Sequence, residues 1–244
     1  MSRPRAPRIA GKLFRAILLA IVFGVTGLAV WRACYSAGEP KTIRVMTPNE
    51  VLAEAYRAAD GDLNCYRQEQ ATITRAKENY GYFSVTRCVF IPEAKQVQLV
   101  FRYNNSTLRH LAEDKNLREV PAKAGTYFDV TLVKSTDLTP DDPTDNLDPS
   151  TLALTRYAAS GDPVRAQTAL YTYFRYTFDG VDVDDLTVGV FADVYYLGDL
   201  STDEATGGFV YPETPYGVLC LWDNESENLP YALTKADRKA IEGK

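Results

Sequence analysis

The chain has 244 residues, of which 45% are hydrophobic and 24% charged, a balance typical of a globular protein with a sizeable core. The net charge of −5 conceals an asymmetry, because residues 1–32 carry six basic side chains and no acid, which leaves −11 on the remainder. Nucleic-acid binding is driven by Lys and Arg that displace counterions from phosphates. An acidic domain of this kind is therefore not expected to bind nucleic acid.

An uncharged apolar run follows a basic N-terminal tail, residues 1–15. The run Ala16–Trp31 would span about 24 Å as a helix, and Leu13 and Phe14 extend it to about 28 Å if Arg15 snorkels towards the headgroups. A hydrocarbon core is about 30 Å thick. We therefore expect residues 16–32 to form a transmembrane helix, with the membrane as the first partner of the chain.

The charge flanks of this helix predict its orientation. The basic cluster precedes the apolar run and no comparable cluster follows it, so the positive-inside rule places the N-terminus in the cytoplasm and the rest outside the cell membrane. A cleaved signal peptide is the alternative, but its apolar region is usually about 7–15 residues and ends at a small-x-small site. Ala33-Cys34 resembles a lipoprotein cleavage site, yet Trp31 and Arg32 do not fit the residues before one.

The segment after the anchor is expected to be a stalk, residues 33–46, and then a helix, residues 47–61. Thr47 can cap this helix, Pro48 suits its first turn and Glu50 completes a capping box. Val51, Leu52, Ala55 and Tyr56 are predicted to share its apolar side, and the helix should stop near Asp60-Gly61. The remainder, residues 62–244, is expected to be an extracytoplasmic β domain.

The first half of that domain shows the two-residue period of strands. Tyr82–Ile91 and Gln96–Tyr103 flank a four-residue turn and predict a hairpin. Pairing Ile91 with Gln96 places Cys88 opposite Leu99, Phe90 opposite Val97 and Thr86 opposite Phe101. The other face, which includes Arg87, Gln98 and Arg102, is expected to be half-solvated. Phe128–Ser135 is a further strand, and the Pro- and Asp-rich residues 139–150 form a loop.

The second half repeats this pattern. Thr168–Phe178 and Leu186–Tyr196 predict another hairpin, and Tyr216–Trp222 a short strand with Val218, Cys220 and Trp222 on its inner face. Thr234 caps a predicted C-terminal helix. About seven short strands joined by turn-rich loops favour a mainly β fold, an Ig-like antiparallel β-sandwich with short flanking helices.

No sequence motif for catalysis or for a cofactor is present. His110 is the one histidine, so a Ser-His-Asp or Cys-His arrangement would have to use it. It lies in a polar segment, and a lone histidine there is expected to be an ordinary surface residue. Four scattered cysteines with one histidine do not supply a zinc site. We therefore predict no catalytic, cofactor-binding or metal-binding residues, and no enzyme activity.

The cysteines allow more than one state. Cys34, Cys65, Cys88 and Cys220 form an even set in a compartment that permits disulfides. Cys34 lies at the membrane, too far to reach the core. Cys88 and Cys220 fall on predicted inner faces, where they can form a bridge or pack as free thiols, and we favour free thiols.

Two clusters are candidates for ligands. Asp179, Asp182, Asp184 and Asp185 lie within seven residues of a turn, which suits calcium, but aspartate is also an ordinary turn residue and we favour a solvated turn. The strand Thr168–Phe178 alternates two aromatic sets. Phe174, Phe178 and Leu170 are expected to face the core, and Tyr171 and Tyr173 to be partly exposed. With Tyr195 or Tyr196 these tyrosines could bind a sugar or peptide, but we favour core packing and ordinary cross-strand aromatic pairing.

These observations favour a membrane-anchored binding or interaction module of the cell envelope, with an envelope protein or a glycan as its partner. A carboxylate-dependent glycan hydrolase is the alternative, supported only by abundant Asp, Glu and Tyr. A structural subunit of a membrane complex is a third hypothesis, and would show an apolar patch on the outer domain.

Overall fold

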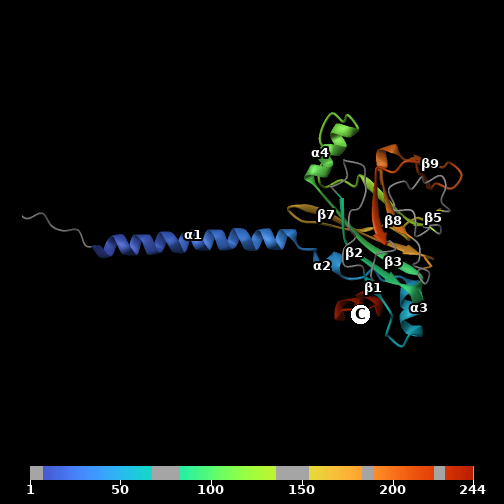
Figure 1. Cartoon of the computed structure of the whole chain (residues 1–244), viewed down its shortest axis with the longest axis horizontal. Helices are drawn as coiled ribbons and strands as arrows, with labels where there is room; N and C mark the ends of the chain where they lie inside the picture. Colours follow the sequence, from blue (N-terminus) through green and yellow to red (C-terminus); the bar gives the residue numbers. More distant parts are fainter. Residues whose placement is uncertain (1–7, 68–82, 136–153, 183–188, 223–228, 244) are drawn as a thin grey trace, which may run out of the picture. The chain divides into compact units, whose positions relative to one another are not determined.

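A computed structural model of the chain describes residues 8–67, 83–135, 154–182, 189–222 and 229–243 (Figure 1). The chain divides into two compact units, Met1–Glu39 and Pro40–Lys244. The first unit contains α1 (Arg8–Ala37), within which Phe14–Arg32 is 19 residues long and apolar enough to cross a membrane. This agrees with the predicted transmembrane segment in length and composition.

The second unit is mainly β, with antiparallel sheets, as the sequence predicts. Its six-stranded sheet has the order β12-β1-β2-β3-β7-β6, and its four-stranded sheet the order β11-β8-β4-β5. The first sheet is built from β1 (Tyr66–Arg67), β2 (Phe83–Ile91), β3 (Gln96–Asn104), β6 (Val164–Gln167), β7 (Tyr171–Asp179) and β12 (Leu229–Pro230). The second is built from β4 (Phe128–Ser135), β5 (Leu154–Tyr157), β8 (Val190–Tyr196) and β11 (Gly217–Trp222). The Ig-like strand order is not confirmed.

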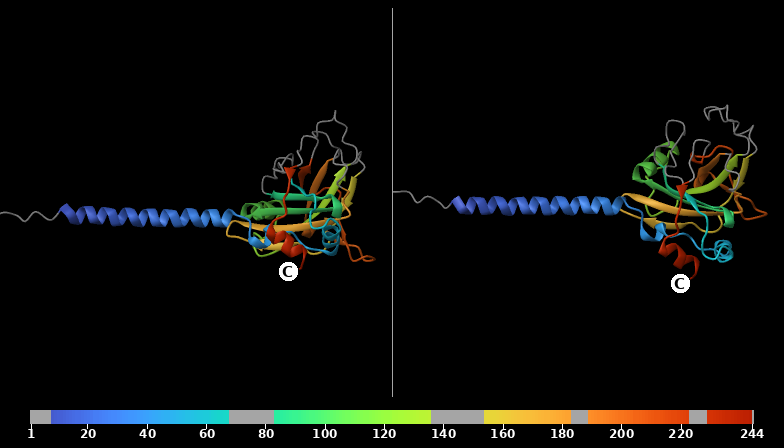
Figure 2. Two further views of the ribbon diagram at one scale, coloured as in Figure 1. Left: turned by 90° about the horizontal axis from the view of Figure 1, so that it is seen from below. Right: turned by 60° about the horizontal axis from the view of Figure 1, so that its bottom comes forward.

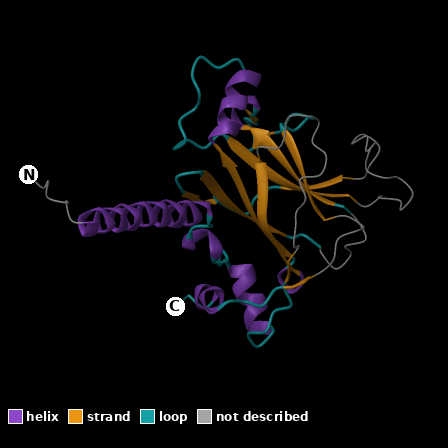
Figure 3. Cartoon of the chain, turned by 60° about the vertical axis from the view of Figure 1, so that its left-hand side comes forward, coloured by secondary structure: helices purple, strands orange, loops and turns teal. Residues whose placement is uncertain are grey.

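Six helices and a small hairpin complete the described part of this unit. Four are the α-helices α2 (Lys41–Arg44), α3 (Glu50–Ala58), α4 (Asn105–Asp114) and α5 (Lys235–Ile241), and two are the one-turn 3₁₀ helices η1 (Pro92–Ala94) and η3 (Leu197–Asp199). The hairpin pairs β9 (Ser201–Thr202) with β10 (Phe209–Val210). Figure 3 shows α4 at one end of the strands and α3 and α5 towards the other.

The main core lies between the inner faces of both sheets. Phe174, Tyr176 and Phe178 of β7 pack in one cluster with residues of β4, β8 and β11, and each is at most 1% exposed. The expectation that Phe174 and Phe178 face the core is confirmed. Leu170 does not share this environment, because it precedes β7 in a turn and is 47% exposed.

Helices cover the other face of the six-stranded sheet (Figure 2). Leu52, Ala55 and Tyr56 of α3 pack with Val89 and Ile91 of β2, and residues of α5 belong to the same cluster. Ile43 of α2 packs with Val100 and Tyr173. The expectation of a half-solvated face is wrong for Gln98, which is 2% exposed, whereas Arg87 and Arg102 are partly exposed.

The first predicted hairpin is confirmed with one change. Ile91 pairs with Gln96, Phe90 with Val97 and Cys88 with Leu99. A β-bulge between Val85 and Arg87 then shifts the register, so that Val85 rather than Thr86 lies opposite Phe101. A bulge adds one residue to one strand, which the alternation of residue types does not reveal.

The second predicted hairpin is wrong. Strand β7 pairs with β3 and β6 in the six-stranded sheet, whereas β8 pairs with β4 and β11 in the other. The connection between them therefore passes from one sheet to the other. The predicted strand began at Leu186 but the described strand begins at Val190, and residues 183–188 lie outside the described part of the chain.

The inner face predicted for residues 216–222 is also wrong. Leu219 and Leu221 are at most 1% exposed and belong to the main core, while Val218 is only partly buried. Both sets of this strand are apolar, so alternation alone did not distinguish them. The strand Phe128–Ser135 is confirmed as β4, whereas the predicted loop of residues 139–150 lies outside the described residues.

The helix predicted at residues 47–61 is confirmed as α3, but Asn49 rather than Thr47 is its N-cap. The Asn49 side chain accepts from the Leu52 backbone N–H at 2.9 Å. The Thr47 hydroxyl instead accepts a hydrogen bond from the Arg175 guanidinium and does not cap the helix. Val51, predicted on the apolar side, is 42% exposed. Within the segment predicted as a stalk, Ile43 and Met46 are buried and belong to the second unit.

The C-terminal helix α5 is capped as predicted, and its cap also fixes the start of the domain. Thr234 and Asp237 form a reciprocal capping box. Asp237, which is fully buried, also accepts from the Met46 backbone N–H at 2.8 Å and from the Tyr231 hydroxyl at 3.2 Å. One carboxylate therefore joins segments near both ends of the domain.

Candidate functional site

The tyrosine surface of β7, considered as an alternative to structural packing, is not available for binding at Tyr173. Tyr173 is fully buried under α2, where Ile43 packs on it. Tyr171 is partly buried, and the Arg102 guanidinium carbon lies 4.2 Å from the centre of its ring. Strand β7 lies between two other strands and has both faces covered, so its second aromatic set is structural.

The first carboxylate of the acidic cluster after β7, that of Asp179, forms structural hydrogen bonds. The Asp179 carboxylate accepts from the Asn49 amide at 2.9 and 3.1 Å and from the Gln96 amide at 2.7 Å. Asp182 is exposed, while Asp184 and Asp185 lie outside the described residues. Among the described residues no group of three or more His, Cys, Asp or Glu is placed to hold a metal ion.

His110 and two of the four cysteines occupy structural positions. His110 lies on α4, with its Nδ1 atom 3.4 Å from a carboxylate oxygen of Glu113 one turn later. Cys65 and Cys88 are buried free thiols, as we favoured. Burial raises the pKa of Cys65 to about 12 and raises that of Cys88 well above its ordinary value, so neither is poised as a nucleophile. The side chains of Cys34 and Cys220 lie outside the described set.

The outer face of the four-stranded sheet carries a cluster of charged and aromatic side chains. Val190, Ala192 and Val194 of β8 point into the core, so the alternation of a strand directs Asp193 and Tyr195 to the other face. The same argument places Asp129 of β4 on this face. The register pairs Asp129 with Tyr195, which makes the two carboxylates diagonal neighbours on adjacent strands.

An ion pair occupies the centre of this cluster. Arg156 of β5 donates to the Asp193 carboxylate at 3.1 Å, and the Tyr195 hydroxyl donates to it at 3.2 Å. Burial raises the pKa of Asp193, and Arg156 and these hydrogen bonds oppose the rise. The Asp193 side chain is 11% exposed and that of Arg156 is 37% exposed, so the guanidinium is the part of the pair that reaches solvent.

The β9–β10 hairpin rests on this cluster through Tyr211. The Tyr211 hydroxyl donates to Asp129 at 2.7 Å, and its ring centre lies 4.8 Å from that of Tyr195. Burial and the neighbouring Asp129 raise the pKa of Tyr211 well above its ordinary value, so the hydroxyl remains a donor at neutral pH. The side chains immediately before Tyr211 are exposed, Phe209 by 53% and Val210 by 48%.

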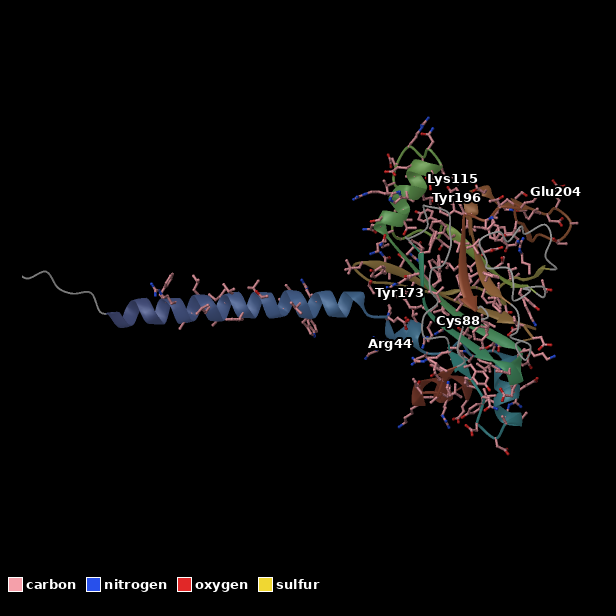
Figure 4. The ribbon with its side chains drawn as sticks, viewed as in Figure 1. Arg44, Cys88, Lys115, Tyr173, Tyr196 and Glu204 are labelled. Carbon is pink, nitrogen blue, oxygen red and sulfur yellow. The ribbon has the colours of Figure 1, made fainter. Side chains whose placement is uncertain are left out.

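Phe209 and Val210 are thus an exposed apolar pair. The residue that follows them, Tyr211, is fixed by its hydrogen bond to Asp129 and by its ring contact with Tyr195. Figure 4 labels Glu204, which lies in the turn of the same hairpin at the outer side of the domain. Aromatic residues and Arg are enriched at protein interfaces relative to the rest of the surface. This arrangement offers apolar contact through Phe209 and Val210 and a positive charge through Arg156.

Sequence reasoning missed this site. Phe209 and Val210 lie in a stretch without strand alternation, between Gly207-Gly208 and Pro212, which has the composition of a loop. Of the sequence candidates, only Tyr195 takes part. Tyr196 lies elsewhere, with the Lys115 ammonium 5.7 Å from its ring centre (Figure 4).

A search for related proteins gives no further assignment. The chain matches no protein-family model, no curated protein and no solved structure.

Proposed function

We propose that this protein is a membrane-anchored, extracytoplasmic binding module of the cell envelope, and that its partner, a protein or a glycan, docks on the β9–β10 hairpin. The observation that carries the proposal is the exposure of Phe209 and Val210 on a hairpin whose base is fixed by Tyr211 and Asp129. Scattered surface apolar residues are ordinary, but two adjacent ones on a supported tip favour contact with a partner.

The cellular placement is part of the same proposal. The apolar segment Phe14–Arg32 and the basic residues before it support a single-pass anchor with a cytoplasmic N-terminus. A reporter that is active only outside the cytoplasm, fused after Lys244, should be active. Activity of a cytoplasmic reporter alone would contradict this orientation.

The architecture that we propose is a β-sandwich, supported by the core shared between two antiparallel sheets. An Ig-like order is not part of the proposal. In that fold successive strands soon pass to the opposite sheet, whereas β1, β2 and β3 are neighbours in one sheet.

The binding proposal is tested by crosslinking in intact cells. A photoreactive amino acid at position 209 should capture a defined partner, and Val210→Ser should reduce the yield of the crosslinked product. The control carries the probe at Val120, which is also 53% exposed but lies in the loop after α4. Equal products from both positions would show that the hairpin is not a specific surface.

A carboxylate-dependent glycan hydrolase is the second candidate, favoured by Asp129 and Asp193. Diagonal neighbours in a sheet lie about 7–8 Å apart at their backbones, and inverting glycosidases use two carboxyl groups about 6.5–9.5 Å apart. The proposal stays second because Asp193 is largely buried and already paired with Arg156. Glycan cleavage by the wild type that is lost in Asp193→Asn and Asp129→Asn would reverse this order.

A further inference from the structure

The side chains at the two ends of the strands in the six-stranded sheet differ in charge. We name these ends after the first and last residues of β7, Tyr171 and Asp179. The segment 43–49 runs over the face of the sheet, parallel to its strands. It begins where Ile43 packs on Tyr173 and ends where the Asn49 amide donates to Asp179. Between these contacts the Thr47 backbone forms hydrogen bonds with the Gln98 side-chain amide. Lys41, which precedes this segment, therefore lies towards the Tyr171 end. The domain thus begins at the end of the sheet that is opposite to Asp179.

The Tyr171 end is basic. Lys41 and Arg44 are exposed on α2, which packs on β6 and β7, and Arg102 lies over the Tyr171 ring. The turn before β7 is held by Lys123, whose ammonium donates to the carbonyls of residues 168 and 169 at 2.7 and 2.6 Å. Arg165 is exposed and donates to the Lys123 carbonyl at 3.1 Å. At the tip of this turn Leu170 is 47% exposed.

The Asp179 end is acidic. The Asp179 backbone N–H donates to the Ser160 hydroxyl at 2.9 Å, which holds the loop with the exposed Asp162 at this end of the strand. Glu50 begins α3 beside the Asn49–Asp179 contact, and Glu93 lies in the turn between β2 and β3. Lys95 is the basic residue of the same turn. The charge of the sheet therefore changes sign along β7.

The length of chain before Pro40 limits how far the basic end can lie from a membrane. The apolar segment ends at Arg32 and α1 ends at Ala37. Five helical steps followed by three extended ones cover at most about 18 Å up to Pro40. The basic end is thus within short covalent reach of the headgroups, if the anchor crosses the membrane as proposed above.

We propose that the Tyr171 end of the domain docks on the anionic phospholipid headgroups of the membrane that holds α1. This inference rests on the proposed membrane anchor and deepens it by naming a second contact with the bilayer. Residues 33–244 have a net charge of −11, so the rest of the domain is repelled by an anionic surface and only this end can approach it. Leu170 enters the interfacial region, while Lys41, Arg44 and Arg165 contact phosphates.

The size of the effect follows from surface electrostatics. Each Lys or Arg near an anionic leaflet favours docking about fivefold, and the attraction falls off within a Debye length. The double variant Lys41→Glu/Arg44→Glu should therefore shift the docking equilibrium by at least about 30-fold. Raising the salt to about 0.5 M should weaken docking of the unchanged protein, since the Debye length shortens.

The test uses the full chain in nanodiscs that contain either anionic or zwitterionic phospholipid. An environment-sensitive fluorophore is attached at Leu170→Cys in a Cys34→Ser/Cys220→Ser background, and quenching by a nitroxide-labelled lipid is measured. We expect strong quenching in anionic discs and weak quenching in zwitterionic discs. A probe at Asp162→Cys, at the acidic end, should be quenched in neither.

The matched control for the charge variant is Arg57→Glu/Lys95→Glu, which makes the same change of net charge away from the basic end. It should leave quenching at position 170 unchanged, whereas Lys41→Glu/Arg44→Glu should abolish it. Equal quenching at position 170 in both lipids, or no effect of either salt or Lys41→Glu/Arg44→Glu, would overturn the docking proposal and leave the anchor intact. A chain that does not co-migrate with the discs at all would overturn the anchor and the docking proposal together.

Discussion

Arg87 and Arg175 donate to the same backbone oxygen, the carbonyl of Ile43, at 2.6 and 3.2 Å. Arg87 also donates to the Arg44 carbonyl at 2.6 Å, and Arg175 to that of Thr42 at 3.1 Å. The last carbonyls of a helix are partly negative and have no partner within the helix. Two arginines thus fix α2, the first element of the domain, to the sheet beneath it.

Replacing Arg175 should therefore destabilise the domain strongly. The residue is 6% exposed, and burial together with the neighbouring Arg87 lowers its pKa to about 10. This value is still well above 7, so Arg175 is charged at neutral pH. Arg175→Met removes three hydrogen bonds, to the Thr42 carbonyl, the Ile43 carbonyl and the Thr47 hydroxyl, at about 1 kcal/mol each. We expect a loss of about 3 kcal/mol in the free energy of unfolding, measured by urea denaturation. Arg44→Met, at an exposed position, should cost no more than about 0.5 kcal/mol, and an equal loss would contradict the assignment.

The two faces of β7 should be equally sensitive to truncation. Phe174 is 1% exposed in the core between the sheets, and Tyr173 is fully buried under α2. Phe174→Ala and Tyr173→Ala should each cost about 3–5 kcal/mol by chemical denaturation, because each removes a large buried ring. Tyr171→Ala serves as the comparison, since that side chain is only partly buried. A cost for Tyr173→Ala as low as that for Tyr171→Ala would show that α2 does not cover this face.

The two buried thiols should resist modification in the folded protein. Thiolate is the reactive form, and burial raises the pKa of Cys65 to about 12 and that of Cys88 further. In a Cys34→Ser/Cys220→Ser background, a disulfide reagent at about pH 8 should react with neither thiol until denaturant is added, and then with both. Rapid reaction of either thiol under native conditions would show that its surroundings open.

The stability of the domain should carry a pH dependence that originates at Asp193. Burial raises the pKa of this carboxyl, so the folded state holds its proton more tightly than the unfolded chain does. The resulting stabilisation is complete at pH values below the ordinary carboxyl pKa and is lost as the pH rises through the folded pKa. The melting temperature of the wild type relative to Asp193→Asn should therefore fall as the pH rises above about 4, the ordinary pKa of a carboxyl group. A difference that stays constant as the pH rises would contradict this prediction, and Asp162→Asn is the control.

Part of this fold follows from local signals in the sequence. The alternation in residues 87–103 predicted the hairpin register from Cys88 to Leu99, because a strand repeats every two residues and the turn fixes its phase. Thr234 predicted the start of α5, because a hydroxyl can satisfy a free helical N–H. The apolar run after the basic tail predicted a helix long enough to cross a membrane.

The tertiary structure alone decided which strands meet and what covers each face. Alternation shows that Phe174 and Tyr173 point in opposite directions, but it does not show that a helix buries the second residue. Gln98 and Arg175 have the residue types of a wet surface, yet both are buried because backbone groups of residues 42–47 satisfy them. The partners of β7 and β8, and the meeting of Tyr211 with Asp129 across 82 positions, depend on contacts between distant segments, which no local pattern encodes.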